Sequence, residues 1–188
     1  ERRLGVNSVA YSPDGDLILS SDYHHLSLWG SKTETCLKER FAWHKEDVHF
    51  VAFSPDGLYA LSGSKDKTIL LSDIKTGTSI RSLLGHMDTI NSLKCSPDGR
   101  YVVSGSSDTT IKLWDLLKGN CLRTIKPRQK VFSVDISPDG RFIASGSNYR
   151  NISMWDLSKS WLGCGFKNQE YLIPSKAFSP DGKFLITG

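Results

Sequence analysis

Cysteine is scarce in this chain, and the four cysteines that occur form no Cys-x-x-Cys pair. Cys36 and Cys121 stand at equivalent places in two similar segments, each just before a leucine and a basic residue. This recurrence is typical of small apolar strand residues rather than of a disulfide framework, so we expect an intracellular, reducing compartment, the cytoplasm or the nucleus. No apolar run reaches the length that a bilayer-spanning helix needs, and we expect no membrane association.

Signals of catalysis and of cofactor binding are also missing. The sequence has no glycine-rich phosphate loop before a helix, no Asp-rich calcium loop and no Gly-x-Ser-x-Gly elbow. Asp22-Tyr23-His24-His25 contains metal-ligating residue types, but adjacent histidines in a tight strand connection point to opposite sides, which favours a solvated turn. We therefore expect no enzymatic activity, no cofactor and no metal. The net charge of +4 is too small to indicate a nucleic-acid surface, and nothing indicates a small-molecule ligand.

What the chain does contain is a tetrapeptide, Ser-Pro-Asp-Gly, that occurs five times. Its serines are separated by 42, 42, 41 and 42 residues, which indicates a repeat array. Proline at the second place fixes φ for a turn, and Asp-Gly supplies the flexible corner behind it. Each tetrapeptide therefore joins two segments that run back along each other. The serines are Ser12, Ser54, Ser96, Ser137 and Ser179.

The segments on either side of these turns have the composition of short strands. VNSVAY, VHFVAF, INSLKC and VFSVDI precede the turns, and they are rich in valine, isoleucine and aromatic residues. No stretch shows the sustained apolar spacing of a helix. Four short strands in each period of about 42 residues predict an all-β fold built of β-propeller blades.

The landmarks of the third repeat make this prediction more specific. Gly85-His86, the Ser-Pro-Asp-Gly turn and Trp114-Asp115 occur at spacings that resemble the WD-repeat family of β-propellers, and the resemblance covers essentially the whole chain. It implies four-stranded antiparallel blades, and we expect residues 1–188 to be part of a larger propeller of about seven blades. The expected repeats span 1–42, 43–84, 85–126, 127–167 and, incompletely, 168–188.

The resemblance also implies a buried polar chain in each repeat, from a tryptophan indole to a serine, a histidine and an aspartate. In the third repeat these residues are His86, Ser104, Asp108 and Trp114, at intervals of 18, 4 and 6. The second repeat keeps the intervals in His44, Ser62, Asp66 and Ser72. A catalytic Ser-His-Asp triad is the alternative interpretation. Because the pattern recurs in successive repeats, whereas an enzyme needs one site, a structural role is favoured.

Partners of the resembling family dock on the face opposite the Ser-Pro-Asp-Gly turns. The implied contact residues flank the first apolar residue of each first strand or precede the aspartate of the next hairpin. Phe132 is the sharpest of these, because it is an aromatic residue beside the basic cluster Lys126, Arg128 and Lys130. The full set is Asn7, Asp47, His49, Lys65, Thr89, Asn91, Ser107, Lys130, Phe132 and Asn148.

These features favour a non-catalytic scaffold that binds a protein or peptide and assembles a multiprotein complex. The alternative is a sensor or regulatory propeller attached to an effector domain, such as an NTPase or a kinase, because very regular Ser-Pro-Asp-Gly copies resemble such arrays. An effector motif in flanking sequence would discriminate between the two functions.

Overall fold

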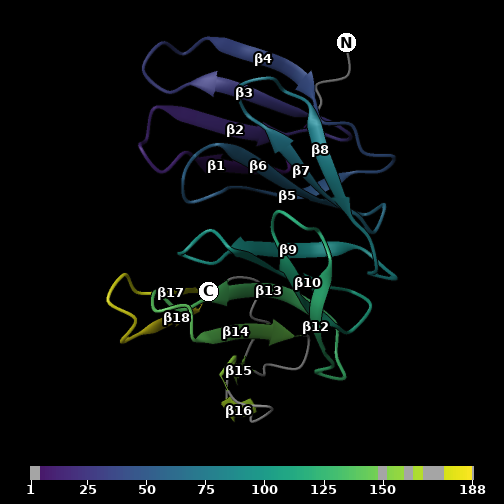
Figure 1. Ribbon diagram of the computed structural model, residues 1–188, viewed down its shortest axis with the longest axis vertical. Helices are drawn as coiled ribbons and strands as arrows, with labels where there is room; N and C mark the ends of the chain where they lie inside the picture. The colour runs from purple at the N-terminus through teal and green to yellow at the C-terminus, as the bar shows by residue number, and fades with distance from the viewer. Residues whose placement is uncertain (1–4, 148–151, 159–162, 167–175, 188) are drawn as a thin grey trace. The chain divides into compact units, whose positions relative to one another are not determined.

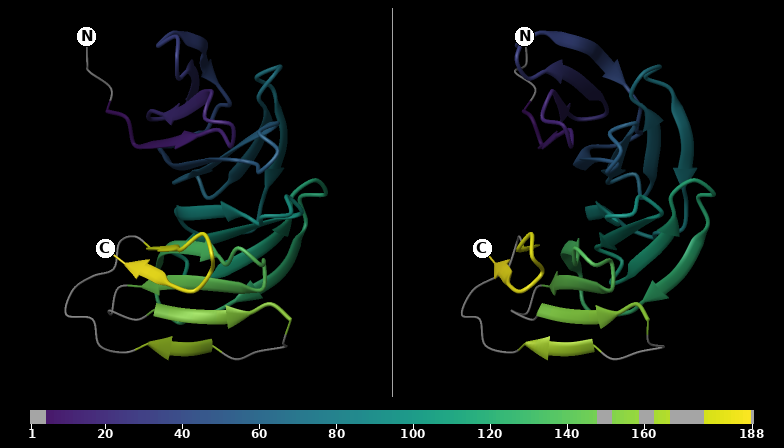
Figure 2. Two further views of the ribbon diagram at one scale, coloured as in Figure 1. Left: turned by 90° about the vertical axis from the view of Figure 1, so that its left-hand side faces the viewer. Right: turned by 60° about the vertical axis from the view of Figure 1, so that its left-hand side comes forward.

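The computed structural model describes residues 5–147, 152–158, 163–166 and 176–187. All regular structure in these ranges is β-strand, which confirms the all-β prediction. The chain divides into two compact units, residues 1–90 and 91–188, and each is described by itself below. Figure 1 and Figure 2 show the strands of each sheet running back and forth beside one another in chain order.

The first unit contains two four-stranded antiparallel sheets. Their strands pair strictly in sequence order, so that each hairpin is made of neighbouring segments. Blade 1 comprises β1 (Ser8–Tyr11), β2 (Leu17–Ser21), β3 (Leu26–Gly30) and β4 (Cys36–Phe41), and blade 2 comprises β5 (Val48–Phe53), β6 (Tyr59–Ser64), β7 (Ile69–Asp73) and β8 (Ser79–Leu83).

The second unit contains two further four-stranded sheets and a two-stranded one, again with antiparallel neighbours. Blade 3 comprises β9 (Ile90–Cys95), β10 (Tyr101–Ser106), β11 (Ile111–Asp115) and β12 (Cys121–Ile125), and blade 4 comprises β13 (Val131–Ile136), β14 (Phe142–Ser147), β15 (Ile152–Asp156) and β16 (Gly163–Phe166). The last pair is β17 (Lys176–Phe178) and β18 (Leu185–Thr187). About four blades are thus present, and the size of a complete ring stays a prediction.

Each Ser-Pro-Asp-Gly segment forms the tight turn between the first and second strands of a sheet. In blade 3 the Gly99 N–H donates to the Ser96 carbonyl at 2.9 Å, and the Ser96 Oγ accepts the Tyr101 N–H at 2.9 Å. Gly99 has φ of 70°, a left-handed conformation that glycine adopts without steric cost. The glycines of the other four turns have φ between 70° and 76°, so one turn geometry recurs.

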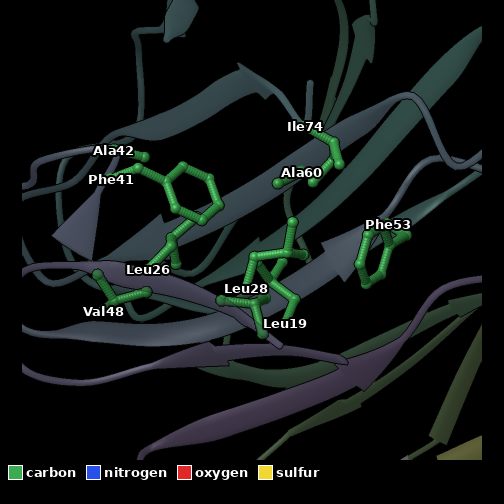
Figure 3. Packing of buried hydrophobic residues seen from close by; sticks show 10 residues of the cluster. Leu19, Leu26, Leu28, Phe41, Ala42, Val48, Phe53, Ala60 and Ile74 are labelled. Carbon is green, nitrogen blue, oxygen red and sulfur yellow. The ribbon is translucent and has the colours of Figure 1, made fainter. Parts of the chain in front are cut away.

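The core of the first unit lies between blades 1 and 2. Figure 3 shows Leu19 and Leu28 of blade 1 close to Phe53 of blade 2, in a cluster that also contains Val51. Val51 and Phe53 alternate along β5, so one face of that strand meets the preceding blade. Each large apolar side chain buried in this way contributes about 1.5–3 kcal/mol.

The second unit repeats this packing between blades 3 and 4. Val134 and Ile136 of β13 are buried in one cluster with Val103 and Ile111 of blade 3. Gly105 allows the close approach, since a Cβ at that position would lie 2.5 Å from Val131 Cγ1. A larger residue there would therefore push the two blades apart.

Strand direction gives every blade two distinct ends. The end that carries the Ser-Pro-Asp-Gly turn is called the turn end. The start of the first strand pairs with the finish of the second, as Ser8 does with Ser21, so the hairpin between the second and third strands lies at the opposite end. That opposite end is called the tip end. The described residues that were predicted to bind a partner lie there.

Candidate functional site

A buried polar line crosses blade 2 near its tip end. The His44 ring is 2.9 Å from Asp66 Oδ2 through Nδ1 and 2.8 Å from Ser62 Oγ through Nε2. Burial alone would raise the pKa of Asp66, but hydrogen bonds from His44, Thr68 and the Lys45 backbone N–H outweigh it and hold that pKa well below its usual range. Asp66 is therefore a carboxylate at neutral pH, and it fixes the histidine ring that orients Ser62.

The indole ends of such lines are present in three other blades. Trp114 Nε1 donates to Ser104 Oγ at 2.8 Å in blade 3, and Trp155 Nε1 donates to Ser145 Oγ at 2.9 Å in blade 4. Both pairs are buried, whereas the equivalent Trp29 of blade 1 is 37% exposed. In blade 2 the residue at the indole position is Ser72, whose Oγ lies 3.3 Å from Ser79 Oγ. In the third repeat His86 is buried and Asp108 is half-buried, and each takes part in an interaction.

The predicted contact residues of blade 2 lie together at its tip end. The Lys65 backbone N–H donates to the Asp47 carbonyl at 2.9 Å, and the Ser64 hydroxyl donates to the Glu46 carbonyl at 3.0 Å. These bonds fix the hairpin against the segment that enters β5. The side chains of Lys65 and His49 project into solvent, and Asp47 is half-buried.

Two predicted contact residues, Asn7 and Asn91, link neighbouring blades. Asn7 Nδ2 donates to the Val48 carbonyl at 3.1 Å, and Asn91 Nδ2 donates to the Val131 carbonyl at 2.8 Å. Asn91 also donates to Ser107 Oγ at 2.9 Å, so two residues of the predicted set are directly connected. Each asparagine therefore fastens the first strand of the next blade at the tip end.

The fourth blade presents the aromatic residue of the set. Phe132 is 36% exposed, while its neighbour Val131 is 1% exposed and anchored in the core. Lys126, Arg128 and Lys130, which precede it, are all exposed. Thr89 is half-buried, with its N–H bonded to the side chain of Asp88, and Asn148 lies outside the described residues.

An aromatic cluster at the tip end of blade 1 was missed by the sequence reasoning. His24 stacks on Trp43, with centroids 5.9 Å apart and planes at 16°, and His25 meets the same indole edge-on at 4.5 Å. The Nδ1 atoms of both histidines are buried without a hydrogen-bond partner, and both residues are half-buried, so the turn is only partly solvated and the two rings meet on Trp43 instead of pointing to opposite sides. Trp43, which stands where the third repeat has Gly85 before its histidine, was the available signal.

The described ranges contain no group of three or more His, Cys, Asp or Glu side chains placed to hold a metal ion. None of their regular elements is a helix of the length and apolarity needed to cross a bilayer. Cys36 and Cys121 are exposed free thiols, and Cys95 is a buried one.

Comparison with known families gives one match. The model of the WD domain, G-beta repeat, matches residues 3–30, 34–73, 77–115 and 119–156, which is more than half of the chain. The second matched segment begins before β4 and ends with β7, so a sequence repeat joins the last strand of one blade to the first three of the next. No curated protein matches the chain. With its four-stranded blades and its four matched repeats, the chain belongs to the WD40 repeat family.

Proposed function

We propose that this WD40 repeat domain is a non-catalytic scaffold that binds a protein or peptide at the tip end of its blades and so assembles a multiprotein complex. WD40 repeats are generally non-catalytic and commonly bind proteins, which supports the coarse function. The free thiols support an intracellular compartment, the cytoplasm or the nucleus. The finer proposal rests on the tip end of blade 4.

The observation that carries it is the placement of Phe132. Its backbone is held on one side by Val131, whose side chain is in the core and whose carbonyl accepts the Asn91 amide. A partly exposed phenylalanine on a rigid strand loses little conformational freedom when a partner covers it. Aromatic anchors of this kind contribute a large share of interface energy.

The surroundings of Phe132 favour an acidic partner. Lys130 precedes Val131, and Lys126 and Arg128 lie in the segment that leads into β13. Ser147 Oγ donates to Gln129 Oε1 at 2.6 Å, which fastens this basic segment to the end of β14. A peptide with an apolar residue for Phe132 and carboxylates for the three cations would match both features.

The test compares the unaltered chain with the double variant Lys130→Ala, Phe132→Ala. Each is immobilised, exposed to the same cell extract, and the retained proteins are identified by mass spectrometry. Proteins retained by the unaltered chain should be lost from the variant, while the melting temperatures of the two chains agree. The variant Lys183→Ala, Phe184→Ala changes an exposed lysine and an exposed phenylalanine at the turn end and serves as the matched control.

Two results would contradict the proposal. One is the same set of retained proteins on the unaltered chain and on the Phe132 variant, since binding would then not use this surface. The other is loss of binding only together with a lowered melting temperature, which would make Phe132 a folding residue.

A further inference from the structure

The second unit has a groove at the turn end, between blades 3 and 4, that the proposed function does not use. Its volume is about 330 Å³. The walls include Pro97, Tyr101 and Leu113 of blade 3, and Pro138 and Leu157 of blade 4. Asp98 and Asp139, one from each Ser-Pro-Asp-Gly turn, line the same groove. An apolar trough with an acidic group on each side therefore opens where the two turns face each other.

The turns of blades 3 and 4, which border this groove, lack a proline–glycine contact that two other pairs of neighbouring turns make. A Cβ at Gly57 would lie 3.6 Å from Pro13 Cδ, and a Cβ at Gly182 would lie 3.3 Å from Pro138 Cδ, so in both cases the proline of one turn packs on the glycine of the next. At Gly140, which faces the turn of blade 3, no atom lies within 4 Å of that position. Turns of the same sequence thus make the proline–glycine contact in two neighbouring pairs and lack it in this pair.

The two carboxylates are ionised, and each uses only one of its oxygens in the hydrogen bonds of its own turn. Asp98 Oδ1 accepts the Ser96 hydroxyl and the Arg100 N–H, and Asp139 Oδ1 accepts the Ser137 hydroxyl and the Arg141 N–H. The serine hydrogen bonds are the main cause of a lowered pKa at both carboxyls. The Oδ2 atoms take no part in these turn contacts.

Two neighbouring cations, Arg100 and Arg141, help to lower the pKa of Asp98 and Asp139 by Coulomb attraction, but their guanidinium groups also have other partners. The Arg100 guanidinium lies over the Tyr101 ring at 5.3 Å, and the Arg141 guanidinium is 3.2 Å from Asp156 and lies over Phe142. Arg123 donates to the Leu157 carbonyl at 3.4 Å. The residues that line the groove carry two negative charges and no positive one.

We propose that this groove binds an arginine side chain of a short basic segment in a partner protein. The planar guanidinium can donate to Asp98 Oδ2 and Asp139 Oδ2, while an apolar neighbour in the segment packs on Leu113 and Leu157. The volume is at the lower limit for ligand pockets, which suits one side chain rather than a drug-sized molecule. This surface lies at the other end of blade 4 from Phe132, so it is a second docking site.

The probe is the pentapeptide acetyl-Ala-Leu-Arg-Leu-Ala-amide, titrated into the full 188-residue chain. Two counterparts replace arginine with citrulline, which keeps the shape without the charge, or with glutamate. Binding is followed through the methyl NMR signals of Leu113 and Leu157. The arginine peptide should shift these signals saturably, and the citrulline peptide should bind at least fivefold more weakly. Added salt should weaken the binding of the arginine peptide but not that of the citrulline peptide.

A pair of matched variants locates the site. Asp98→Asn with Asp139→Asn keeps an Oδ1 acceptor for each turn and removes both charges, so it should fold and lose at least fivefold in affinity for the arginine peptide. Asp14→Asn with Asp56→Asn makes the same change in the turns of blades 1 and 2, where Pro13 packs on Gly57, and should bind like the unaltered chain.

The proposal is overturned by equal binding of the citrulline or glutamate peptide, by equal losses in the two variants, or by no saturable shift at about 5 mM peptide. The citrulline comparison uses the unaltered chain and holds even if a variant fails to fold. No arm of this experiment changes the Phe132 surface. A negative result with the arginine peptide therefore leaves the proposed function unaffected, and a negative result with the Phe132 variant leaves this groove unaffected.

Discussion

Trp114 of blade 3 and Trp29 of blade 1 make the same hydrogen bond in different surroundings. Each indole Nε1 donates to a serine hydroxyl of the adjacent strand at 2.8 Å, to Ser104 in one case and to Ser20 in the other. Trp114 is fully buried, whereas Trp29 is 37% exposed. The bond is therefore set by pairing within a blade, while its contribution to stability depends on whether water can replace it.

The largest expected effect comes from Trp114→Phe. The substitution leaves the buried Ser104 hydroxyl without its indole and opens space in the core, and we expect it to lower the free energy of unfolding by about 2–3 kcal/mol. Trp29→Phe, the matched control, should cost less than about 1 kcal/mol because water reaches Ser20. Urea denaturation of both variants measures the difference, and equal costs would show that burial does not distinguish the two bonds.

A smaller effect, on stability in acid, is expected at Asp66, the carboxylate of the polar line in blade 2. The pKa of Asp66 is depressed in the folded chain from its ordinary value of 3.8. Its contribution to stability is therefore full above about pH 4 and is lost as the pH falls through the folded pKa. Asp66→Asn should be less stable than the unaltered chain at pH 7, and the gap should narrow below pH 4.

Denaturation at a series of pH values follows this gap. Asp14→Asn is the control, because Asp14 is an exposed carboxylate in a turn of the same unit. A gap between the Asp66 variant and the unaltered chain that stays constant from pH 7 to pH 3 would show that the His44–Asp66 contact does not depend on the carboxylate charge.

The smallest effect is expected at Ser72, which stands where blade 3 has Trp114. Ser72 is buried, and its hydroxyl makes one long hydrogen bond, 3.3 Å to the Ser79 hydroxyl. Ser72→Ala removes one weak bond and no indole, so it should cost less than about 1 kcal/mol, clearly below Trp114→Phe. A cost as large as that of Trp114→Phe would argue against a special role for the indole.

The sequence predicted the features that depend on neighbouring residues. Ser-Pro-Asp-Gly determines a turn locally, and the intervals between turns leave room for four strands. The roles of Asn7 and Asn91 were not predictable, because their acceptors are carbonyl groups 41 and 40 residues away. The open groove at Gly140 depends on how neighbouring turns of identical sequence are spaced, for which no residue pattern is a signal.

The stacking of His24 and His25 on Trp43 has a similar origin. The histidines belong to the hairpin of blade 1, and the indole belongs to the segment that enters blade 2. Period and turn signals describe each blade alone, whereas this contact requires the packing of two. Trp43 breaks the Gly-His landmark of its repeat, so departures from a repeat are the places where a sequence of this kind indicates something beyond the fold.

We propose that stability and recognition are separate in this chain: buried residues of the blades provide stability, and Phe132 and Lys130 at the tip end provide recognition. The most direct measurement is the dissociation constant of an identified partner for three folded proteins: the unaltered chain, Trp114→Phe, and Lys130→Ala with Phe132→Ala. We expect Trp114→Phe to lower stability yet bind within about twofold of the unaltered chain. We expect the double variant to keep its melting temperature yet bind at least tenfold more weakly, which corresponds to about 1.4 kcal/mol or more. Unchanged affinity of the double variant would contradict a role of Phe132 and Lys130 in recognition.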